Sequence, residues 1–169
     1  MFGPKKNSLT ATCACGRVEF HAQGAPIISL ICHCDDCQEA GRQLEALPNA
    51  PPLRDANGGT GYLAFRKDRV RCTHGAALLI PHKIRENSPT NRLVATCCNS
   101  AMLLNFDDSK HWVDLYRARV QGHVPPIEMR VGTKFAAGDV PKDVPSYPRY
   151  AFRFIAKLMA ARIAMLFGR

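Results

Sequence analysis

Seven of the eight cysteines in this 169-residue chain fall into three short clusters. The clusters are Cys13-Ala14-Cys15, the run Cys32-His33-Cys34-Asp35-Asp36-Cys37, and Cys97-Cys98. Thiolates that lie one to three residues apart can converge on one soft cation, and zinc is a common partner of such groups in proteins. The spacing therefore predicts a zinc protein with one or two bound ions. Plain buried thiols and a disulfide switch are the alternatives.

Two of the clusters together suit a closed, structural site. Cys13 and Cys15 supply one pair of ligands, and Gly16 permits the sharp backbone turn that points both sulfurs the same way. Cys97 and Cys98 lie some 80 residues later and could supply the other pair. Such a site would join the N-terminal hairpin to a late strand.

The remaining cluster has a different chemistry. Cys32, Cys34 and Cys37 form a cradle of three thiols with no fourth ligand in the same segment. A zinc ion with an open coordination position is typical of a catalytic or substrate-binding site, so these three residues are also the catalytic candidates. On an extended backbone His33 would point to the opposite face, and it is expected to lie behind the ligands or at the surface.

The remaining cysteine and histidines carry less signal. Cys72 stands alone beside a predicted strand and is expected in the core. The other histidines without motif context are expected to be core or surface residues rather than ligands: His74, His82, His111 and His123.

The elements that must position these thiols are mainly strands. Short segments with strand composition are separated by turn signals at 9–12, 17–23, 27–31, 62–66, 70–72, 76–80, 92–96 and 101–106. One short helix is expected around Cys37, with Asp35 as N-cap, Gln38 completing a capping box, and an end near Leu47. The pattern predicts a mostly antiparallel β domain.

Four segments are expected along the chain: a flexible N-terminus at 1–8, a β domain at 9–116, a Pro- and Gly-rich arm at 117–148, and a C-terminal helix at 149–169. Most of the net charge of +9 lies after residue 116, in a segment that contains ten basic and three acidic side chains. The helix is both basic and apolar, so it could dock on the body, on a second copy of the chain, or on a membrane surface. The body lacks the interleaved aromatic and basic residues of single-strand binders, and nucleic acid is not expected.

The order of these motifs resembles the glutathione-dependent formaldehyde-activating enzyme and centromere protein V superfamily over residues 9–116. The resemblance is carried by Cys13-x-Cys15-Gly16-x-Val18-x-Phe20, Cys32-His33-Cys34-x-x-Cys37-Gln38, Gly61-Tyr62 and the late cysteines. It implies a β-tent, in which small antiparallel sheets surround zinc. It also implies a structural zinc at the first and last clusters, and a second zinc at Cys32, Cys34 and Cys37 that engages the glutathione thiol or its hydroxymethyl adduct.

The late motif departs from the family pattern, Phe-Cys-x-x-Cys-Gly. Aligning Cys98 with the second family cysteine leaves Ala95 in place of the first, whereas aligning Cys97 with the first leaves Ser100 in place of the second. The structural site could therefore have three sulfurs, be altered, or merge with the other cluster. The chain looks closest to an uncharacterised branch with this adjacent-cysteine form.

Two functions follow as expectations. The first is a carbon–sulfur lyase that resembles S-(hydroxymethyl)glutathione synthase and binds glutathione or another small thiol, with Arg17 or Arg42 as candidates for its carboxylates. The second is a non-catalytic zinc module whose C-terminal helix docks on a partner, a second subunit or a membrane surface. Met1 to Thr10 lacks the apolar core of a signal peptide, and clustered free thiols suit a reducing compartment, so a cytoplasmic location is expected.

Overall fold

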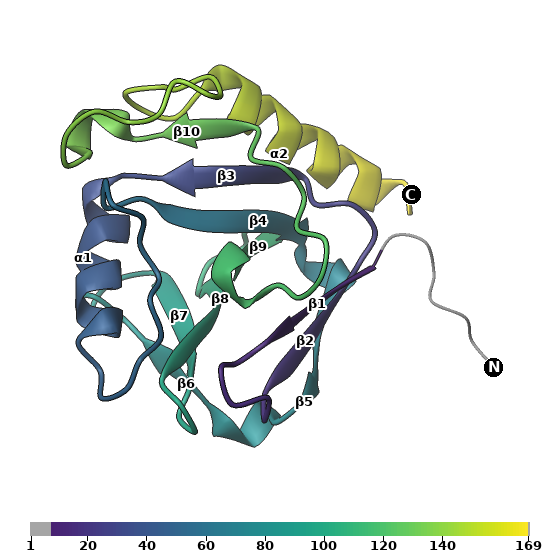
Figure 1. The fold of residues 1–169 in the computed structure, drawn as a ribbon. Coiled ribbons are helices and arrows are strands. Elements are labelled where there is room, and N and C mark those ends of the chain that lie inside the picture. The colour runs from purple at the N-terminus through teal and green to yellow at the C-terminus, as the bar shows by residue number, and fades with distance from the viewer. Residues whose placement is uncertain (1–7, 169) are drawn as a thin grey trace.

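Two β-sheets carry the fold in the computed structural model, which describes residues 8–168 (Figure 1). The smaller sheet is antiparallel and has the order β1-β2-β5, with β1 at Ser8–Thr12, β2 at Glu19–Gln23 and β5 at Val70–His74. The larger sheet has the order β10-β3-β4-β9-β8-β7-β6. Its strands along the chain are β3 (Ile28–Cys32), β4 (Thr60–Arg66), β6 (Leu79–His82), β7 (Thr90–Ala95), β8 (Ser100–Phe106), β9 (Trp112–Tyr116) and β10 (Met129–Val131).

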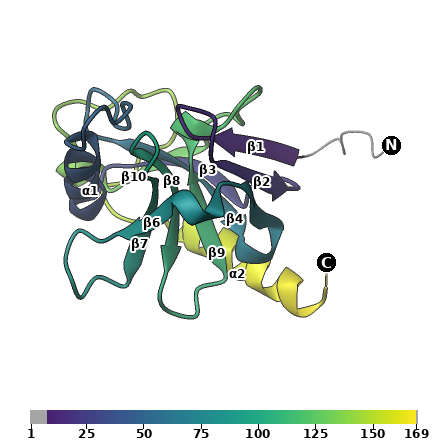
Figure 2. The same cartoon turned by 90° about the horizontal axis from the view of Figure 1, so that it is seen from below.

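Two α-helices complete these elements: α1 at Asp35–Glu45 and α2 at Phe152–Leu166. Four short 3-10 turns lie at Lys67–Arg69, Ala76–Leu78, Arg117–Arg119 and Thr133–Phe135. Both views place α1 and the β1–β2 hairpin on different sides of the molecule (Figures 1 and 2). The predicted mainly-β fold with a short helix and a C-terminal helix is confirmed.

Some details differ from the sequence prediction. The segment predicted as a strand at 76–80 begins as a 3-10 turn, and its strand β6 starts only at Leu79. Neither β9 nor β10 was predicted. β10 has only three residues and pairs in parallel with β3, so its strand conformation depends on a partner about 100 residues away in sequence.

The predicted capping box at the start of α1 is wrong by one residue. Cys34 is the N-cap, and Asp35 is the first helical residue. The Asp35 carboxylate accepts a hydrogen bond from the Asp36 amide at 3.0 Å, while the Gln38 side-chain amide donates to the His33 carbonyl oxygen at 2.8 Å. These contacts, and not an aspartate cap, fix the start of the helix. Cys34 therefore lies at the N-terminus of α1.

Alternation along the strands divides the core into two clusters, one on each face of the large sheet. One face carries Tyr62, Ala64 and Tyr116, which pack with residues of α1. The opposite face carries Leu63 and Leu115, which pack with the β1–β2 hairpin. Because each cysteine group lies beside a different cluster, the sheet separates the two candidate metal sites.

The C-terminal segment, residues 129–168, packs on the face of the large sheet that carries Tyr62 and Tyr116. The Arg130 amide donates to the Pro145 carbonyl oxygen, and the Tyr147 amide donates to the Arg130 carbonyl oxygen, both at 2.9 Å. Helix α2 is then fixed to the body by the Leu158 carbonyl oxygen, which lies 2.7 Å from His111 Nε2, and by an ion pair between Lys157 and Glu128. Residues 1–7 of the predicted flexible N-terminus lie outside the described part, and Ser8 begins β1.

Candidate metal centres and the adjoining pocket

Four cysteines from distant parts of the chain form the first group. The Sγ atoms of Cys13, Cys15, Cys97 and Cys98 all lie within 4.8 Å of one another. The Cys13–Cys15, Cys13–Cys97 and Cys15–Cys97 sulfur distances are 3.6, 3.8 and 3.3 Å. Four sulfurs arranged tetrahedrally at 2.3 Å from zinc would be separated by about 3.8 Å. The donor set and its spacing therefore fit a closed tetrathiolate site.

A tight turn allows two adjacent cysteines to face the same centre. The Cys97 and Cys98 sulfurs are 3.9 Å apart, and the turn that carries them ends at Asn99, whose φ of +52° is left-handed. Asparagine tolerates this conformation better than most residues. The side chain of Ser100, in the second family position, contacts the Cys98 sulfur at 3.1 Å and accepts a hydrogen bond from the Ala14 amide at 3.0 Å. Ser100 thus links the Cys97-Cys98 turn to the Cys13-Cys15 turn by hydrogen bonds.

Local hydrogen bonds favour the anionic form of one thiol of this group, Cys15. Hydrogen bonds to the Cys15 sulfur lower its pKa to about 6. The backbone amide of Arg17 contributes most, then the Arg17 guanidinium, and then the thiol of Cys97. The Val18 amide donates to the Cys13 sulfur at 3.2 Å. Gly16 has a φ of +78°, as the predicted sharp turn requires. Because metals bind thiolates, these donors prepare the hairpin for a cation.

Three cysteines form the second group, on the opposite face of the sheet. Cys32 ends β3, Cys34 is the N-cap of α1, and Cys37 lies in its first turn. Their sulfurs lie within 4.8 Å of one another, and among residues 8–168 no other His, Cys, Asp or Glu joins them. The Tyr62 hydroxyl donates to the Cys37 sulfur at 3.7 Å. This set offers a metal three protein ligands and leaves a position for another group.

The C-terminal segment holds this group closely. The His33 amide donates to the Val131 carbonyl oxygen at 2.9 Å, which joins β3 to β10 just before the cradle. Gly132 follows, with a φ of +69°, and a Cβ placed on it would lie 2.7 Å from the Cys34 backbone nitrogen. Only glycine fits this approach without displacing Cys34.

The three thiols share negative charge unequally. Hydrogen bonds from the thiols of Cys32 and then Cys37 lower the pKa of Cys34 to about 3. The pKa of Cys32 is raised well above its usual value. Its hydrogen bond to Cys34 contributes most, then its hydrogen bond to Cys37, and then its burial. Cys34 is therefore the anionic member, and binding of a cation by all three requires proton release from the others.

His33 lies away from both groups of sulfurs. It is fully buried, so the surface position considered from the sequence is wrong, and neither ring nitrogen has a hydrogen-bond partner in the described part. Its ring packs beside Gly59, where a Cβ would approach His33 Cε1 to 2.5 Å. Cys72 also lies apart from the metal groups, with its thiol 3.1 Å from the His74 carbonyl oxygen. All eight cysteines are free.

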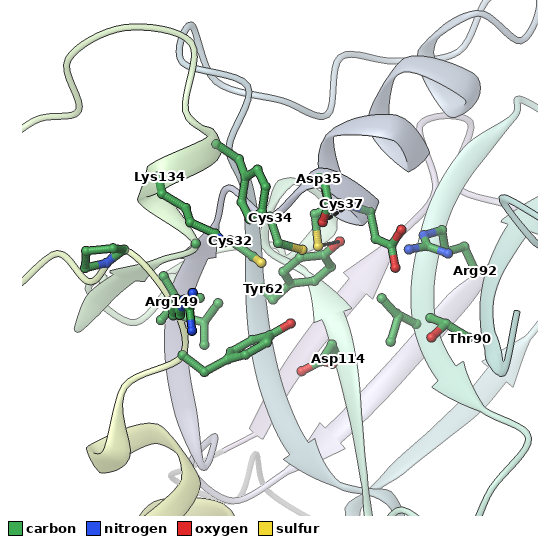
Figure 3. Close-up of a pocket in the computed structure, with 18 of the residues that line it drawn as sticks. Cys32, Cys34, Asp35, Cys37, Tyr62, Thr90, Arg92, Asp114, Lys134 and Arg149 are labelled. Carbon is green, nitrogen blue, oxygen red and sulfur yellow. Dashed lines mark hydrogen bonds between the residues drawn. The ribbon is translucent and has the colours of Figure 1, made fainter.

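A cavity of about 470 Å³ opens beside the second group (Figure 3). Cys32, Cys34 and Cys37 line it together with residues of β4, β7, β8 and β9 and of the C-terminal segment. Figure 3 shows Arg92 and Thr90 on one side of the cysteines, and Lys134 and Arg149 on the other. The first group lines none of this cavity, so the second is the group positioned to meet a small molecule.

The family model described as "Glutathione-dependent formaldehyde-activating enzyme" matches residues 8–47. The resemblance predicted from the sequence is confirmed over this segment. It contains Cys13, Cys15 and the whole second group. A comparison with curated proteins gives no significant match. Among solved structures, a crystal structure of a Rhodobacter sphaeroides protein is similar, with a TM-score of 0.48 and 17% identity, covering 69% of this chain and 91% of that chain.

This formaldehyde-activating family resemblance did not identify the charged residues of the pocket. The two arginines suggested from the sequence, Arg17 and Arg42, do not line the cavity. Arg17 donates to the Cys97 carbonyl oxygen at 3.4 Å, and Arg42 pairs with Glu39 at 2.7 Å. The cavity is instead lined by Arg92 and Asp114, which lie on β7 and β9. A charged residue at an inward position of an apolar strand, as Asp114 is in Trp112–Tyr116, is the sequence signal that could have identified it.

Proposed function

We propose that this chain is a zinc-dependent enzyme of carbon–sulfur bond chemistry, acting on adducts of glutathione or another small thiol. The observation that carries the proposal is the cradle of Cys32, Cys34 and Cys37, which opens on a cavity large enough for a small molecule. S-(Hydroxymethyl)glutathione is the candidate adduct, because the matching family is described as activating formaldehyde with glutathione. A reducing compartment such as the cytoplasm would keep the thiols available.

The donor chemistry of each group suggests its role. A zinc ion held by Cys32, Cys34 and Cys37 would supply a Lewis acid and one open position for a substrate thiolate. The four-cysteine group has a full set of ligands and lines none of the cavity, so its proposed role is structural. It would connect the β1–β2 hairpin to the turn between β7 and β8.

The pocket residues contribute orientation and exclusion of water. In the proposed reaction a sulfur–carbon bond forms between the thiol and the carbonyl carbon of formaldehyde, and the thiol proton ends on the carbonyl oxygen. Tyr62 is buried and holds Cys37 by its hydroxyl, so the cradle stays fixed. Leu104 and Phe106 provide apolar walls. Holding the two reactants together replaces a bimolecular encounter by a local one.

The test is the rate of condensation of glutathione with formaldehyde, followed by consumption of free thiol. Wild type should exceed the spontaneous rate, and Cys34→Ser should return it to that rate. Cys72→Ser is the matched control because Cys72 belongs to neither group. A wild-type rate equal to the spontaneous rate, in protein loaded with zinc, would remove this activity from consideration.

A second function is favoured by the outer face of α2. Phe152, Ile155, Met159, Ile163 and Leu166 recur at intervals of three or four residues and are 49–84% exposed. Side chains at this spacing share one face of a helix, so they form one continuous apolar stripe. The buried Leu158 lies outside the stripe, against the body.

We propose that this stripe binds an anionic membrane surface. At 100° per residue, the exposed Arg153 and Arg162 flank the stripe on its two sides, where they could meet lipid phosphates. The sequence from 149 to 169 contains no acidic residue, so two such helices packed together would oppose cation to cation. Within residues 8–168 no helix is long and apolar enough to cross a bilayer, which leaves a position parallel to its surface.

Vesicle co-sedimentation tests this second proposal. Binding to phosphatidylserine-containing vesicles should exceed binding to pure phosphatidylcholine vesicles, and Arg153→Gln with Arg162→Gln should remove the difference. Equal sedimentation with both vesicle types would contradict the proposal. Self-association through α2, measured by analytical ultracentrifugation and abolished by Met159→Glu, would instead assign the stripe to a second copy.

A further inference from the structure

A buried, unpaired arginine lies in the wall of the pocket. Arg92 is only 2% exposed, and its Nε and Nη1 atoms have no hydrogen-bond partner in the described part of the chain. No ion pair with Arg92 occurs among residues 8–168. A guanidinium cannot lose its charge at physiological pH, and a buried charge without a partner is costly. The arrangement therefore suits an anion that comes from outside the chain.

A carboxyl group lies in the same cavity. Asp114 keeps part of its surface open to the cavity but lies deep in the protein, and this burial raises its pKa to about 7. It forms no ion pair in the described residues, with Arg92 or with any other cation. A cation placed beside Asp114 would favour its charged form.

Strand register places both groups on one face of the sheet. Arg92 pairs with Leu104 across β7 and β8, and Leu104 pairs with Asp114 across β8 and β9. Residues directly opposite each other on neighbouring strands point to the same face, and two strand spacings separate the Arg92 and Asp114 backbones by about 10 Å. All three residues line the cavity. A cationic and an anionic group thus stand on either side of Leu104.

We propose that Arg92 and Asp114 bind the carboxylate and the ammonium group of an α-amino acid moiety in the substrate thiol. Arg92 takes the carboxylate through its planar fork, and Asp114 takes the ammonium. The inference rests on the proposed function, since it assumes that the thiol end lies at Cys32, Cys34 and Cys37. It narrows the substrate class to thiols that carry a zwitterionic amino acid end.

The other charged residues of the cavity differ from this pair. Lys134, Arg149, Asp35 and Asp36 are all exposed. Lys134 lies over the ring of Phe135, 4.4 Å from its centroid. Exposed charges at a rim are screened by water and discriminate ligands weakly, whereas buried groups left unpaired reject a ligand that cannot satisfy them.

Calorimetric titration of the purified, zinc-loaded protein at about pH 8, where Asp114 is ionised, separates the contributions. The probes are L-cysteine, 3-mercaptopropionate without the ammonium, cysteamine without the carboxylate, and 2-mercaptoethanol without both. L-Cysteine should bind best. Arg92→Met should weaken L-cysteine and 3-mercaptopropionate by about tenfold or more and leave cysteamine unchanged. Asp114→Asn should weaken L-cysteine and cysteamine but leave 3-mercaptopropionate unchanged.

Arg42→Met is the control, since it removes an exposed arginine outside the cavity and should change none of the four affinities. Equal binding of all four thiols to wild type, or an equal loss of all four in Arg92→Met with an unchanged melting temperature, would overturn the amino acid site and leave the proposed thiol chemistry standing. Failure of every thiol to bind would overturn both. Circular dichroism melting of each variant shows whether it is folded.

Discussion

Two leucines of α2 allow the same substitution to test a buried and an exposed position of one helix. Leu166 is 78% exposed on the apolar stripe, whereas Leu158 is 7% exposed and faces the body. Leu→Ala removes about 2.4 kcal/mol of apolar transfer free energy at about 0.8 kcal/mol per carbon. Scaled by its exposure, Leu166→Ala should weaken binding to anionic vesicles by about 2 kcal/mol, or about thirtyfold. Leu158→Ala should not weaken vesicle binding.

The stability of the two variants should show the reverse order. Leu158→Ala leaves a cavity between α2 and the sheet and should lower the free energy of unfolding by about 2–5 kcal/mol. Leu166→Ala removes few contacts and should change this free energy by less than about 0.5 kcal/mol. Vesicle sedimentation and urea unfolding measure the two quantities. Equal vesicle affinity of wild type and Leu166→Ala would refute the assignment of the stripe to a membrane.

Further predictions concern the pocket. Gly132→Ala should lower the unfolding midpoint more than Gly138→Ala and should reduce the zinc content; both glycines have positive φ, but only a Cβ at 132 meets the Cys34 backbone, and the Gly138 site is open. Equal effects in metal analysis and melting would show that the close approach is unimportant. Because the Asp114 pKa is raised from 3.8 to about 7 in the folded state, its ionisation costs stability as pH rises from about 4 to about 7. Asp114→Asn should therefore raise the melting temperature relative to wild type more at about pH 8 than at about pH 4; a difference independent of pH, measured by scanning calorimetry, would contradict the burial of this carboxyl.

The sequence allowed prediction of those parts of the site that local spacing determines. Cys32, Cys34 and Cys37 lie within six residues, so the strand end and helix turn that follow bring them together almost wherever the segment is placed. The first cluster is similar, because Gly16 fixes the turn after Cys15. The assignment of these cysteines as zinc ligands stays a prediction, although the structure gathers them as expected.

The rest depends on pairing between distant segments, which periodicity does not reveal. Arg92 and Asp114 meet the cysteines only because β7, β8, β9, β4 and β3 are neighbours in one sheet. β9 was missed because its five residues are interrupted by the charge of Asp114. Gly132 reads as an ordinary loop glycine until β10 is placed beside β3. The charge at Asp114 that obscured the strand is therefore also the mark of the pocket.

The most direct test of the account is the metal content of the purified protein by inductively coupled plasma mass spectrometry. Wild type and Cys72→Ser should each contain two zinc ions per chain, and Cys34→Ser should contain one, since only the second group is lost. Wild-type protein that remains metal-free after expression and purification with zinc present, or an unchanged zinc content in Cys34→Ser, would contradict the central claim that two separate groups of thiolates bind metal.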